Sequence, residues 1–159
     1  DQEEKITQDD CKKCPIGTYG PDLGAIAIAN CIKCAPGTFN AADGQSHELS
    51  CFDCDRGKYR NNSGGSNCID CENGKYINTR GSSKCKKCRI GRYSNEEGVK
   101  NCFDCSIGRY NNKKGAASEQ ECLHCSTGTY NQQTGQSVCK SCTPGTYQNK
   151  NKSVVCKGK

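Results

Sequence analysis

A cysteine-anchored unit recurs eight times along the chain and limits what this sequence can fold into. In each unit an opening cysteine is followed three residues later by a first glycine and five residues later by an aromatic residue. A second glycine stands ten residues after the opening cysteine in seven of the eight units, and every unit ends on a closing cysteine. Two residues, here called the link, separate each closing cysteine from the next opening cysteine. Repetition at a short period predicts a tandem array of one small structural unit.

The units differ in length only before the closing cysteine. Successive opening cysteines are 20, 20, 17, 17, 17, 20 and 17 residues apart. The first, second and sixth of the eight repeats therefore carry three additional residues. We number the units as repeats 1 to 8. The predicted divisions are an acidic N-terminal tail with the first link at residues 1–13, then repeats at 14–33, 34–53, 54–70, 71–87, 88–104, 105–124, 125–141 and 142–159, the last including a basic tail.

The composition leaves no room for a conventional hydrophobic core. Cysteine accounts for 17 of the 159 residues, whereas Ile, Leu, Val and Phe together account for only 19. A chain this poor in large apolar residues does not bury enough surface to offset its ordering entropy, and a short cysteine-rich chain is typical of a disulfide scaffold. A membrane span needs about 20 consecutive apolar residues, and the longest apolar run here is 25–29. Covalent cross-links are therefore expected to stabilise the fold.

The glycine and aromatic positions predict a hairpin in each repeat. The first glycine suits a tight turn with positive φ, the aromatic lies in a short extended segment, and the second glycine suits the left-handed position of a polar loop. We expect a small disulfide-rich fold, an elongated tandem array of eight short irregular β-hairpin modules with little or no helix. The aromatic rings are expected to cover disulfides. The apolar first residue of five links is expected to pack one repeat on the next, and each repeat to touch only its neighbours.

We favour a disulfide between the opening and closing cysteines of each repeat, although spacing alone does not establish connectivity. Each such bond closes a loop of about 15–18 residues and is worth about 3 kcal/mol of unfolded-state entropy. Cys11 is then left over, which indicates either an intermolecular bond or an upstream partner. The favoured pairs are Cys14–Cys31, Cys34–Cys51, Cys54–Cys68, Cys71–Cys85, Cys88–Cys102, Cys105–Cys122, Cys125–Cys139 and Cys142–Cys156.

Two stretches, Cys31-Ile-Lys-Cys34-Ala-Pro-Gly37-Thr-Phe39 and Cys139-Lys-Ser-Cys142-Thr-Pro-Gly145-Thr-Tyr147, resemble the ephrin-receptor-like cysteine-rich repeat. The opening half of each unit is also similar to the smaller modules of tumour-necrosis-factor-receptor ectodomains, and the periodic Cys-x2-Cys pattern is similar to that of ciliate surface antigens. The resemblance covers residues 11–156. It implies an extracellular array of small disulfide-bonded modules, of the kind found in receptors, adhesion proteins and protist surface coats, with no catalytic residues to carry over.

A four-thiolate zinc site is the main alternative use of the Cys-x2-Cys pairs. Zinc would consume the pairs two at a time, and the periods show no such alternation. The glycine also lies three residues after the second cysteine instead of directly following it, and the resembled family is disulfide-bonded. We therefore expect no metal and no other cofactor. His47 and His124 lie in different repeats, and no acid/base pair, nucleophile elbow or phosphate loop is present, so the sequence predicts no enzyme.

Three features are candidates for binding or modification. Repeat 1 carries Ile26 and Ile28, which would project from one face of an extended segment and offer an interface. Two sequons, at Asn61 and Asn151, are possible N-glycosylation sites. Four consecutive repeats carry a basic residue between the first glycine and the aromatic, and regular stacking would align them as a basic stripe suited to acidic glycans or an acidic protein. The stripe residues are Lys58, Lys75, Arg92 and Arg109.

These observations predict an extracellular or cell-surface protein with a structural or adhesive role, such as a secreted, self-assembling component of a surface coat or filament. The charges of the two ends are opposite, net −4 over residues 1–10 and net +4 over residues 148–159. Head-to-tail self-assembly is therefore one expected interaction, and an extracellular protein or acidic glycan is another. A receptor ectodomain segment that binds a protein ligand is the alternative function, and a protein with several four-cysteine zinc sites is a minor one. The net charge of +6 is too diffuse to indicate a nucleic-acid partner.

Overall fold

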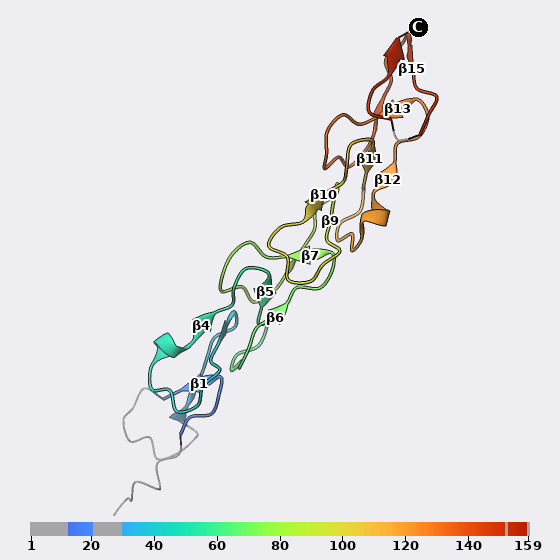
Figure 1. Cartoon of the computed structure of the whole chain (residues 1–159). Helices are drawn as coiled ribbons and strands as arrows, with labels where there is room; N and C mark the ends of the chain where they lie inside the picture. Colours follow the sequence, from blue (N-terminus) through green and yellow to red (C-terminus); the bar gives the residue numbers. More distant parts are fainter. Residues whose placement is uncertain (1–12, 21–29, 152, 159) are drawn as a thin grey trace, which may run out of the picture. The chain divides into compact units, whose positions relative to one another are not determined.

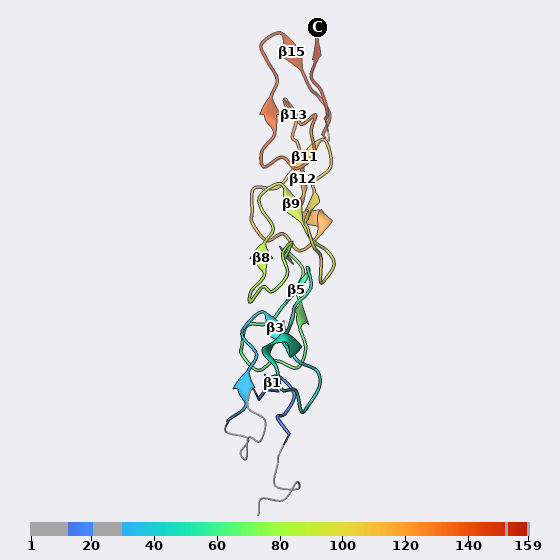
Figure 2. The same ribbon diagram turned by 90° about the vertical axis from the view of Figure 1, so that its left-hand side faces the viewer.

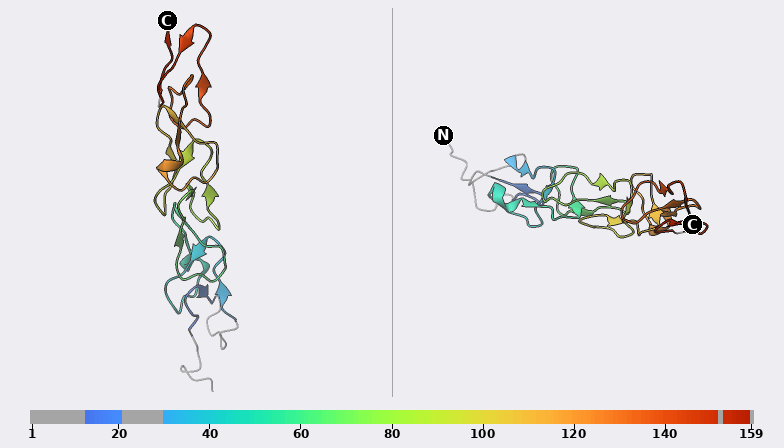
Figure 3. Two further views of the ribbon diagram at one scale, coloured as in Figure 1. Left: turned by 90° about the vertical axis from the view of Figure 1, so that its right-hand side faces the viewer. Right: turned by 90° about the horizontal axis from the view of Figure 1, so that it is seen from above.

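The computed structural model describes residues 13–20, 30–151 and 153–158 of the chain (Figure 1). These residues form eight two-stranded antiparallel sheets, one per repeat, and contain no α-helix. Every strand is two residues long, and turns and loops make up most of each repeat (Figure 3). The pairs are β1 (Thr18–Tyr19) with β2 (Ile32–Lys33), β3 (Thr38–Phe39) with β4 (Phe52–Asp53), β5 (Lys58–Tyr59) with β6 (Ile69–Asp70), β7 (Lys75–Tyr76) with β8 (Lys86–Lys87), β9 (Arg92–Tyr93) with β10 (Phe103–Asp104), β11 (Arg109–Tyr110) with β12 (Leu123–His124), β13 (Thr129–Tyr130) with β14 (Lys140–Ser141) and β15 (Thr146–Tyr147) with β16 (Lys157–Gly158).

Each hairpin is closed by one disulfide between its opening and closing cysteines. The eight bonds join the same pairs that the cysteine spacing favours, from Cys14–Cys31 in repeat 1 to Cys142–Cys156 in repeat 8. Cys11 lies outside the described residues. The fold is therefore a set of small disulfide-closed β-hairpins.

The two glycines of the unit adopt the predicted positive-φ conformation. Gly91, for example, has φ +79° and lies at the third position of a turn in which Arg92 N–H donates to Arg89 C=O at 3.1 Å. Positive φ at that position is the requirement of a type II turn, which favours glycine. The turn places the next two residues in the first strand of the hairpin, so the short Cys-to-Gly spacing determines where β-structure begins.

The links form the second strand of each hairpin, a role that the sequence analysis does not assign to them. In repeat 5 the register pairs Tyr93 with Phe103 and Arg92 with Asp104. The aromatic therefore faces the first link residue of its own hairpin, and the Tyr93 and Phe103 ring centroids are 5.8 Å apart. The expectation that the apolar link residues pack one repeat on the next is wrong, because they lie across the strand pair and stay exposed, Phe103 by 43% and Phe52 by 60%.

The chain divides into two compact units. Unit 1 comprises residues 1–69 and 79–84, and unit 2 comprises residues 70–78 and 85–159. In unit 2 the hairpins follow one another in chain order, from yellow-green to red in Figure 2.

Neighbouring repeats within a unit are joined by four backbone hydrogen bonds. Between repeats 5 and 6, Gly91 N–H donates to Asn111 C=O at 2.7 Å and Ser94 N–H to Ala116 C=O at 3.0 Å. In the opposite direction, Gly115 N–H donates to Cys88 C=O at 2.8 Å. Cys105 N–H donates to the carbonyl of the first glycine of repeat 5 at 2.9 Å. The same four bonds recur between repeats 1 and 2 in unit 1, so backbone positions of the motif hold the stack together irrespective of most side chains.

A repeat also contacts the repeat two places further along, which the expectation of nearest-neighbour contacts missed. The Cα of Gly91 in repeat 5 lies against the backbone carbonyl of Gly135 in repeat 7, and a Cβ at Gly91 would overlap that oxygen. Gly17 meets Gly64 in the same way in unit 1. Glycine is therefore required at this position for two reasons: the positive φ, and the close approach of a backbone carbonyl from the repeat two places along.

The core of each unit is a narrow column that contains the opening cysteines and, in most repeats, the residue that follows the aromatic. All described opening cysteines except Cys142 are buried. Ile77 and Ser94 are 0% exposed, and three asparagines in the equivalent position of other repeats are 2% exposed or less. The large apolar side chains lie mostly outside this column. The buried residues after the aromatics are Asn40, Ile77, Ser94, Asn111 and Asn131.

Substitution of Asn40 by alanine is expected to destabilise unit 1 by about 1–3 kcal/mol. The buried Asn40 side chain donates from Nδ2 to Thr18 C=O at 2.9 Å, and its Oδ1 accepts from Ala42 N–H at 3.0 Å. Thr18 is 8% exposed, so its carbonyl would lose its partner without access to bulk water. Urea unfolding of the oxidised protein measures the effect, with the exposed Asn62→Ala as the control, expected within about 0.5 kcal/mol of the parent. Equal stabilities for the two variants would contradict the role of Asn40.

In repeats 2 and 6 the three additional residues form a single 3-10 turn. In repeat 2 this is η3 (Glu48–Ser50), in repeat 6 it is η4 (Glu119–Glu121), and in each the closing cysteine donates its N–H to the first residue of the turn at 2.9 Å. Three residues make one full turn of a 3-10 helix, so the chain returns to the same place before the closing cysteine. The Cα–Cα distance of the disulfide is 5.6 Å in both repeats, close to the 5.8 Å of the shorter repeat 5.

Candidate functional site

The four residues of the predicted basic stripe each begin the first strand of a hairpin, but they are not a row of uncommitted cations. Lys75 contacts Glu72 at 2.8 Å, and this hydrogen bond and the lysine charge lower the pKa of Glu72 below its usual value. Arg92 Nε contacts Asp104 Oδ1 at 2.6 Å, and Arg109 donates to the carbonyl of Cys122 at 3.3 Å. Lys58, in unit 1, also has an interaction partner. Internal partners thus take up much of the charge that the stripe would offer.

The other predicted sites fall in exposed or undescribed positions. Asn61 and the serine of its sequon, Ser63, are both exposed. Asn151 is exposed, but Ser153 of its sequon is 6% exposed and donates its hydroxyl to Lys150 C=O at 2.7 Å. Ile26 and Ile28 lie outside the described residues.

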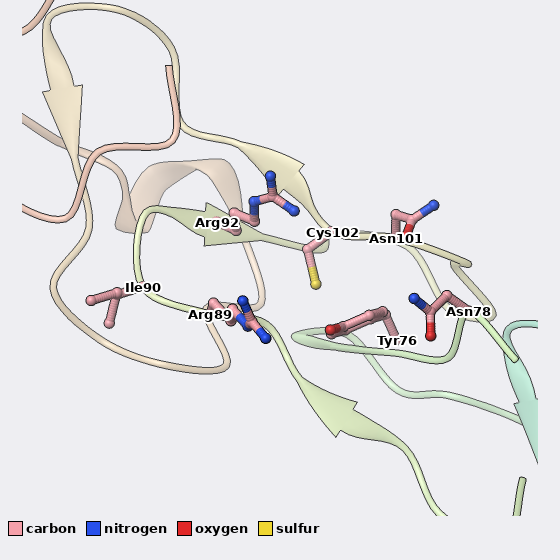
Figure 4. A pocket seen from close by; sticks show the side chains of 7 residues that line it. All are labelled: Tyr76, Asn78, Arg89, Ile90, Arg92, Asn101 and Cys102. Carbon is pink, nitrogen blue, oxygen red and sulfur yellow. The ribbon is translucent and has the colours of Figure 1, made fainter. Parts of the chain in front are cut away.

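A pocket of 380 Å³ lies between repeats 4 and 5 in unit 2 (Figure 4). Repeat 4 supplies the residues just after its first glycine, and repeat 5 supplies its turn, its first strand and its closing cysteine. Tyr76 and Cys102 of the next repeat border the same cavity (Figure 4). That the aromatic rings cover disulfides stays a prediction. The lining residues are Tyr76, Asn78, Arg89, Ile90, Arg92, Asn101 and Cys102.

The pocket is polar and positively charged. Two of its seven lining residues are arginines and none is acidic. Arg89 is exposed, and within the described part of the chain its guanidinium forms no ion pair or side-chain hydrogen bond. Arg92 is held in place through Nε by Asp104. An arginine fixed by a carboxylate next to an unpaired one is an arrangement suited to binding an anion.

Arg89 was not predicted as a site residue from the sequence, although a comparison of the repeats contains a signal for it. The residue directly after the opening cysteine is acidic in repeats 3 and 4, at Asp55 and Glu72, and is basic only in repeat 5. Repeat 5 is thus the one repeat with basic residues both one and four positions after its opening cysteine, at Arg89 and Arg92. In repeat 4 the equivalent pair, Glu72 and Lys75, neutralises itself. The charge reversal in repeat 5 leaves a net positive site.

Partial burial raises the pKa of Tyr93, which is in the same hairpin as the two arginines, and the negative charge of Glu119 adds to the effect. The phenol therefore stays protonated at neutral pH and adds no negative charge to this part of unit 2.

Two further structural findings bear on function. Within residues 13–20, 30–151 and 153–158, no group of three or more His, Cys, Asp and Glu residues is placed to hold a metal ion. None of the helical segments in the same ranges has the length and apolar character needed to cross a membrane.

Comparison with known proteins identifies a family for the part of the chain that contains the pocket. Residues 74–122 match the family described as tyrosine-protein kinase ephrin type A/B receptor-like. The match covers the hairpins from β7 to η4 and the whole of the pocket. No curated protein matches the chain significantly. Receptor-like modules of this kind and extensive disulfides are both features of extracellular domains. The disulfide-bonded repeat array and the match over residues 74–122 together support an ephrin-receptor-like cysteine-rich module in this part of the chain.

Proposed function

We propose that the chain is an extracellular structural and adhesive protein, a component of a surface coat or filament, whose array of repeats is extended by a second copy of the same chain. Its rigidity would come from the disulfide of each repeat and from the backbone bonds between repeats. The observation that carries the proposal is an open position at the last repeats of unit 2.

The stacking contacts are incomplete at repeats 7 and 8. Among the described residues, a Cβ built at Gly128 or Gly145 meets no atom within 4 Å, whereas one built at the internal Gly91 overlaps the carbonyl of Gly135. Nearby apolar side chains are also exposed, Tyr147 by 45% and Val155 by 52%. This surface has the shape that accepts a further repeat elsewhere in unit 2, so a further repeat, whether of the same polypeptide or of a second copy, would fit it.

The charges of the two ends favour the same contact. Residues 148–159 carry a net charge of +4 and residues 1–10 a net charge of −4. Opposite charges at the two ends favour a heterologous head-to-tail contact, which generates open filaments when the rotation does not close. Exposed charges are screened within about 8–10 Å at physiological salt, so assembly is expected to weaken as salt rises.

The substitution Gly128→Ala is expected to abolish end-to-end assembly and leave the single chain folded. Its Cβ would occupy the place where the carbonyl of an incoming repeat must lie, as a Cβ at Gly91 would meet Gly135. Sedimentation velocity over a range of protein concentrations measures the assembly, in the oxidised Cys11→Ser background so that exchange at that thiol does not contribute.

Gly158→Ala is the matched control, because Gly158 also meets nothing within 4 Å but has no positive φ. It should assemble like the parent. A parent that sediments as a monomer at every concentration and salt would overturn the proposal, and so would a Gly128→Ala variant that assembles normally.

A receptor ectodomain segment is the second candidate, favoured by the match of residues 74–122 to the ephrin receptor-like family. In that case the exposed apolar link residues would serve a protein ligand instead of a second copy. A monomeric parent that binds a cell-surface protein through unit 2 would support this function over the first.

A further inference from the structure

We propose that the pocket between repeats 4 and 5 binds an acidic saccharide, namely a sugar residue with a carboxylate, as found in extracellular glycans. The proposal concerns a single site in unit 2 and does not depend on self-assembly. The proposed ligand site is this one cavity and not the predicted basic stripe, because several polar side chains of the cavity have no partner within the described residues.

The pocket is lined by several polar side chains that have no partner in the described part of the chain. Tyr76, Asn78, Arg89 and Asn101 all line the pocket, and none forms a side-chain hydrogen bond or ion pair in the described part of the chain. Together they offer a phenol, two amides and a guanidinium. Amides both donate and accept hydrogen bonds, which suits the hydroxyl groups of a sugar.

The lining also carries a positive charge. Asp104 pairs with Arg92, so the charge that attracts an anion is that of Arg89. A planar guanidinium matches a carboxylate with two parallel hydrogen bonds, and Arg89 is unpaired and able to form them. Asp104 holds Arg92 at 2.6 Å, so its position is set before a ligand arrives.

The mixture of side chains in the lining favours a sugar over an acidic peptide. Tyr76 contributes an aromatic ring beside the amide of Asn78, with Asn101 on the same side, and Ile90 contributes an aliphatic side chain at the opposite side of the lining (Figure 4). A sugar ring has apolar C–H faces and a rim of hydroxyls, and this mixture of surfaces matches both. A Glu or Asp side chain would use Arg89 but offers neither the rim of hydroxyls nor the ring face that the amides and the apolar side chains of the lining match. The volume of 380 Å³ lies within the range of small-molecule sites.

The test uses a disaccharide of glucuronic acid and N-acetylglucosamine, titrated into the full-length oxidised protein labelled with ¹⁵N. We expect shifts of the side-chain amide signals of Asn78 and Asn101 and of the Arg89 Nε signal. The neutral disaccharide of two N-acetylglucosamine residues should bind far more weakly, because it lacks the carboxylate.

Arg89→Gln is expected to raise the dissociation constant by roughly tenfold to a hundredfold, the usual loss for a hydrogen bond to a charged group. Arg89 is exposed and unpaired, so the variant should keep the parent spectrum elsewhere. Arg56→Gln removes the same charge from an exposed arginine of unit 1 and should leave affinity unchanged.

Three results would overturn the proposal. Equal losses from Arg89→Gln and Arg56→Gln would indicate diffuse attraction, and shifts confined to other residues would place binding elsewhere. Tighter binding of tetraglutamate than of the disaccharide at the same signals would assign the pocket to acidic peptides.

Discussion

Reduction of the eight disulfides is expected to unfold the protein completely at 25 °C in the absence of denaturant. The buried column consists mainly of cystine and small polar side chains, and large apolar residues such as Phe52, Phe103 and Leu123 are 43–60% exposed. Without the cross-links the unfolded chain regains the entropy of eight loops, each worth about 3 kcal/mol. Dispersion of the ¹H–¹⁵N signals, followed as a phosphine reductant is added, measures the loss. A reduced chain that keeps dispersed signals would contradict the prediction.

Removal of single disulfides separates the loop entropy from the packing. Cys88–Cys102 and Cys142–Cys156 both have a sequence separation of 14, so their loop-closure entropies are equal. Cys88 and Cys102 are 0% and 9% exposed, whereas the cysteines of the last repeat are only half-buried. Replacing either pair by alanine should cost about 3 kcal/mol, and the internal pair should cost more because it leaves a cavity. Equal costs would show that packing around the buried sulfurs adds nothing.

Gly91→Ala is expected to destabilise unit 2 by about 1–3 kcal/mol more than Gly128→Ala, the substitution of the equivalent glycine of repeat 7. The native φ of +79° is strained for alanine by about 1–2 kcal/mol. The new Cβ would also overlap the backbone carbonyl of Gly135, which cannot rotate away as a side chain does. Overpacking of this kind typically costs about 1–3 kcal/mol more.

Gly128→Ala is the matched control for the stacking contact. Gly128 has φ +76°, so the backbone strain is the same, but a Cβ there meets nothing within 4 Å. Urea unfolding at protein concentrations below those of assembly should therefore give a loss of about 1–2 kcal/mol for this variant. The difference between the two variants measures the contact between repeats 5 and 7. If both variants lose the same stability, the close approach makes no energetic contribution.

The hairpins and their cross-links could be predicted from the sequence because they depend on local spacing. An opening cysteine followed three residues later by glycine leaves room only for a tight turn, and this turn starts the first strand. The second strand was missed because each link is only two residues long, with no alternating pattern to mark it. Tyr93 and Phe103 pair across strands through a register that no local pattern in the sequence indicates.

The contacts between repeats could not be predicted for a different reason. They use backbone atoms, such as Gly91 N–H and Asn111 C=O, which leave no trace in residue type. The position after the aromatic is held by Asn, Ile, Ser, Gly, Gln or Arg in different repeats, so its burial is hidden by variation. The first glycine of each repeat was explained by its positive φ alone, although the contact with the repeat two places along also requires a residue without a Cβ.

The pocket was missed because its residues come from two repeats and are separated by up to 26 positions in the sequence. Arg92 was singled out as one of four equivalent basic residues, whereas the structure distinguishes it by its neighbour Arg89. Aligning the repeats shows that only repeat 5 has a basic residue directly after its opening cysteine. That this residue lines a pocket depends on the side chains that repeat 4 contributes to the same cavity.

The single 3-10 turns also show where foreign peptides could be grafted into this scaffold. The hydrogen bonds that join neighbouring repeats end at the residue after the second glycine, such as Gln45 in repeat 2, and η3 lies beyond it. Leu49 within η3 is 79% exposed, so this segment contributes little to the buried column. Loop entropy grows slowly with length, by about 0.6 kcal/mol for each doubling. A foreign peptide inserted at this point would therefore be held by a disulfide-closed hairpin, and the repeats already accommodate two loop lengths before the closing cysteine.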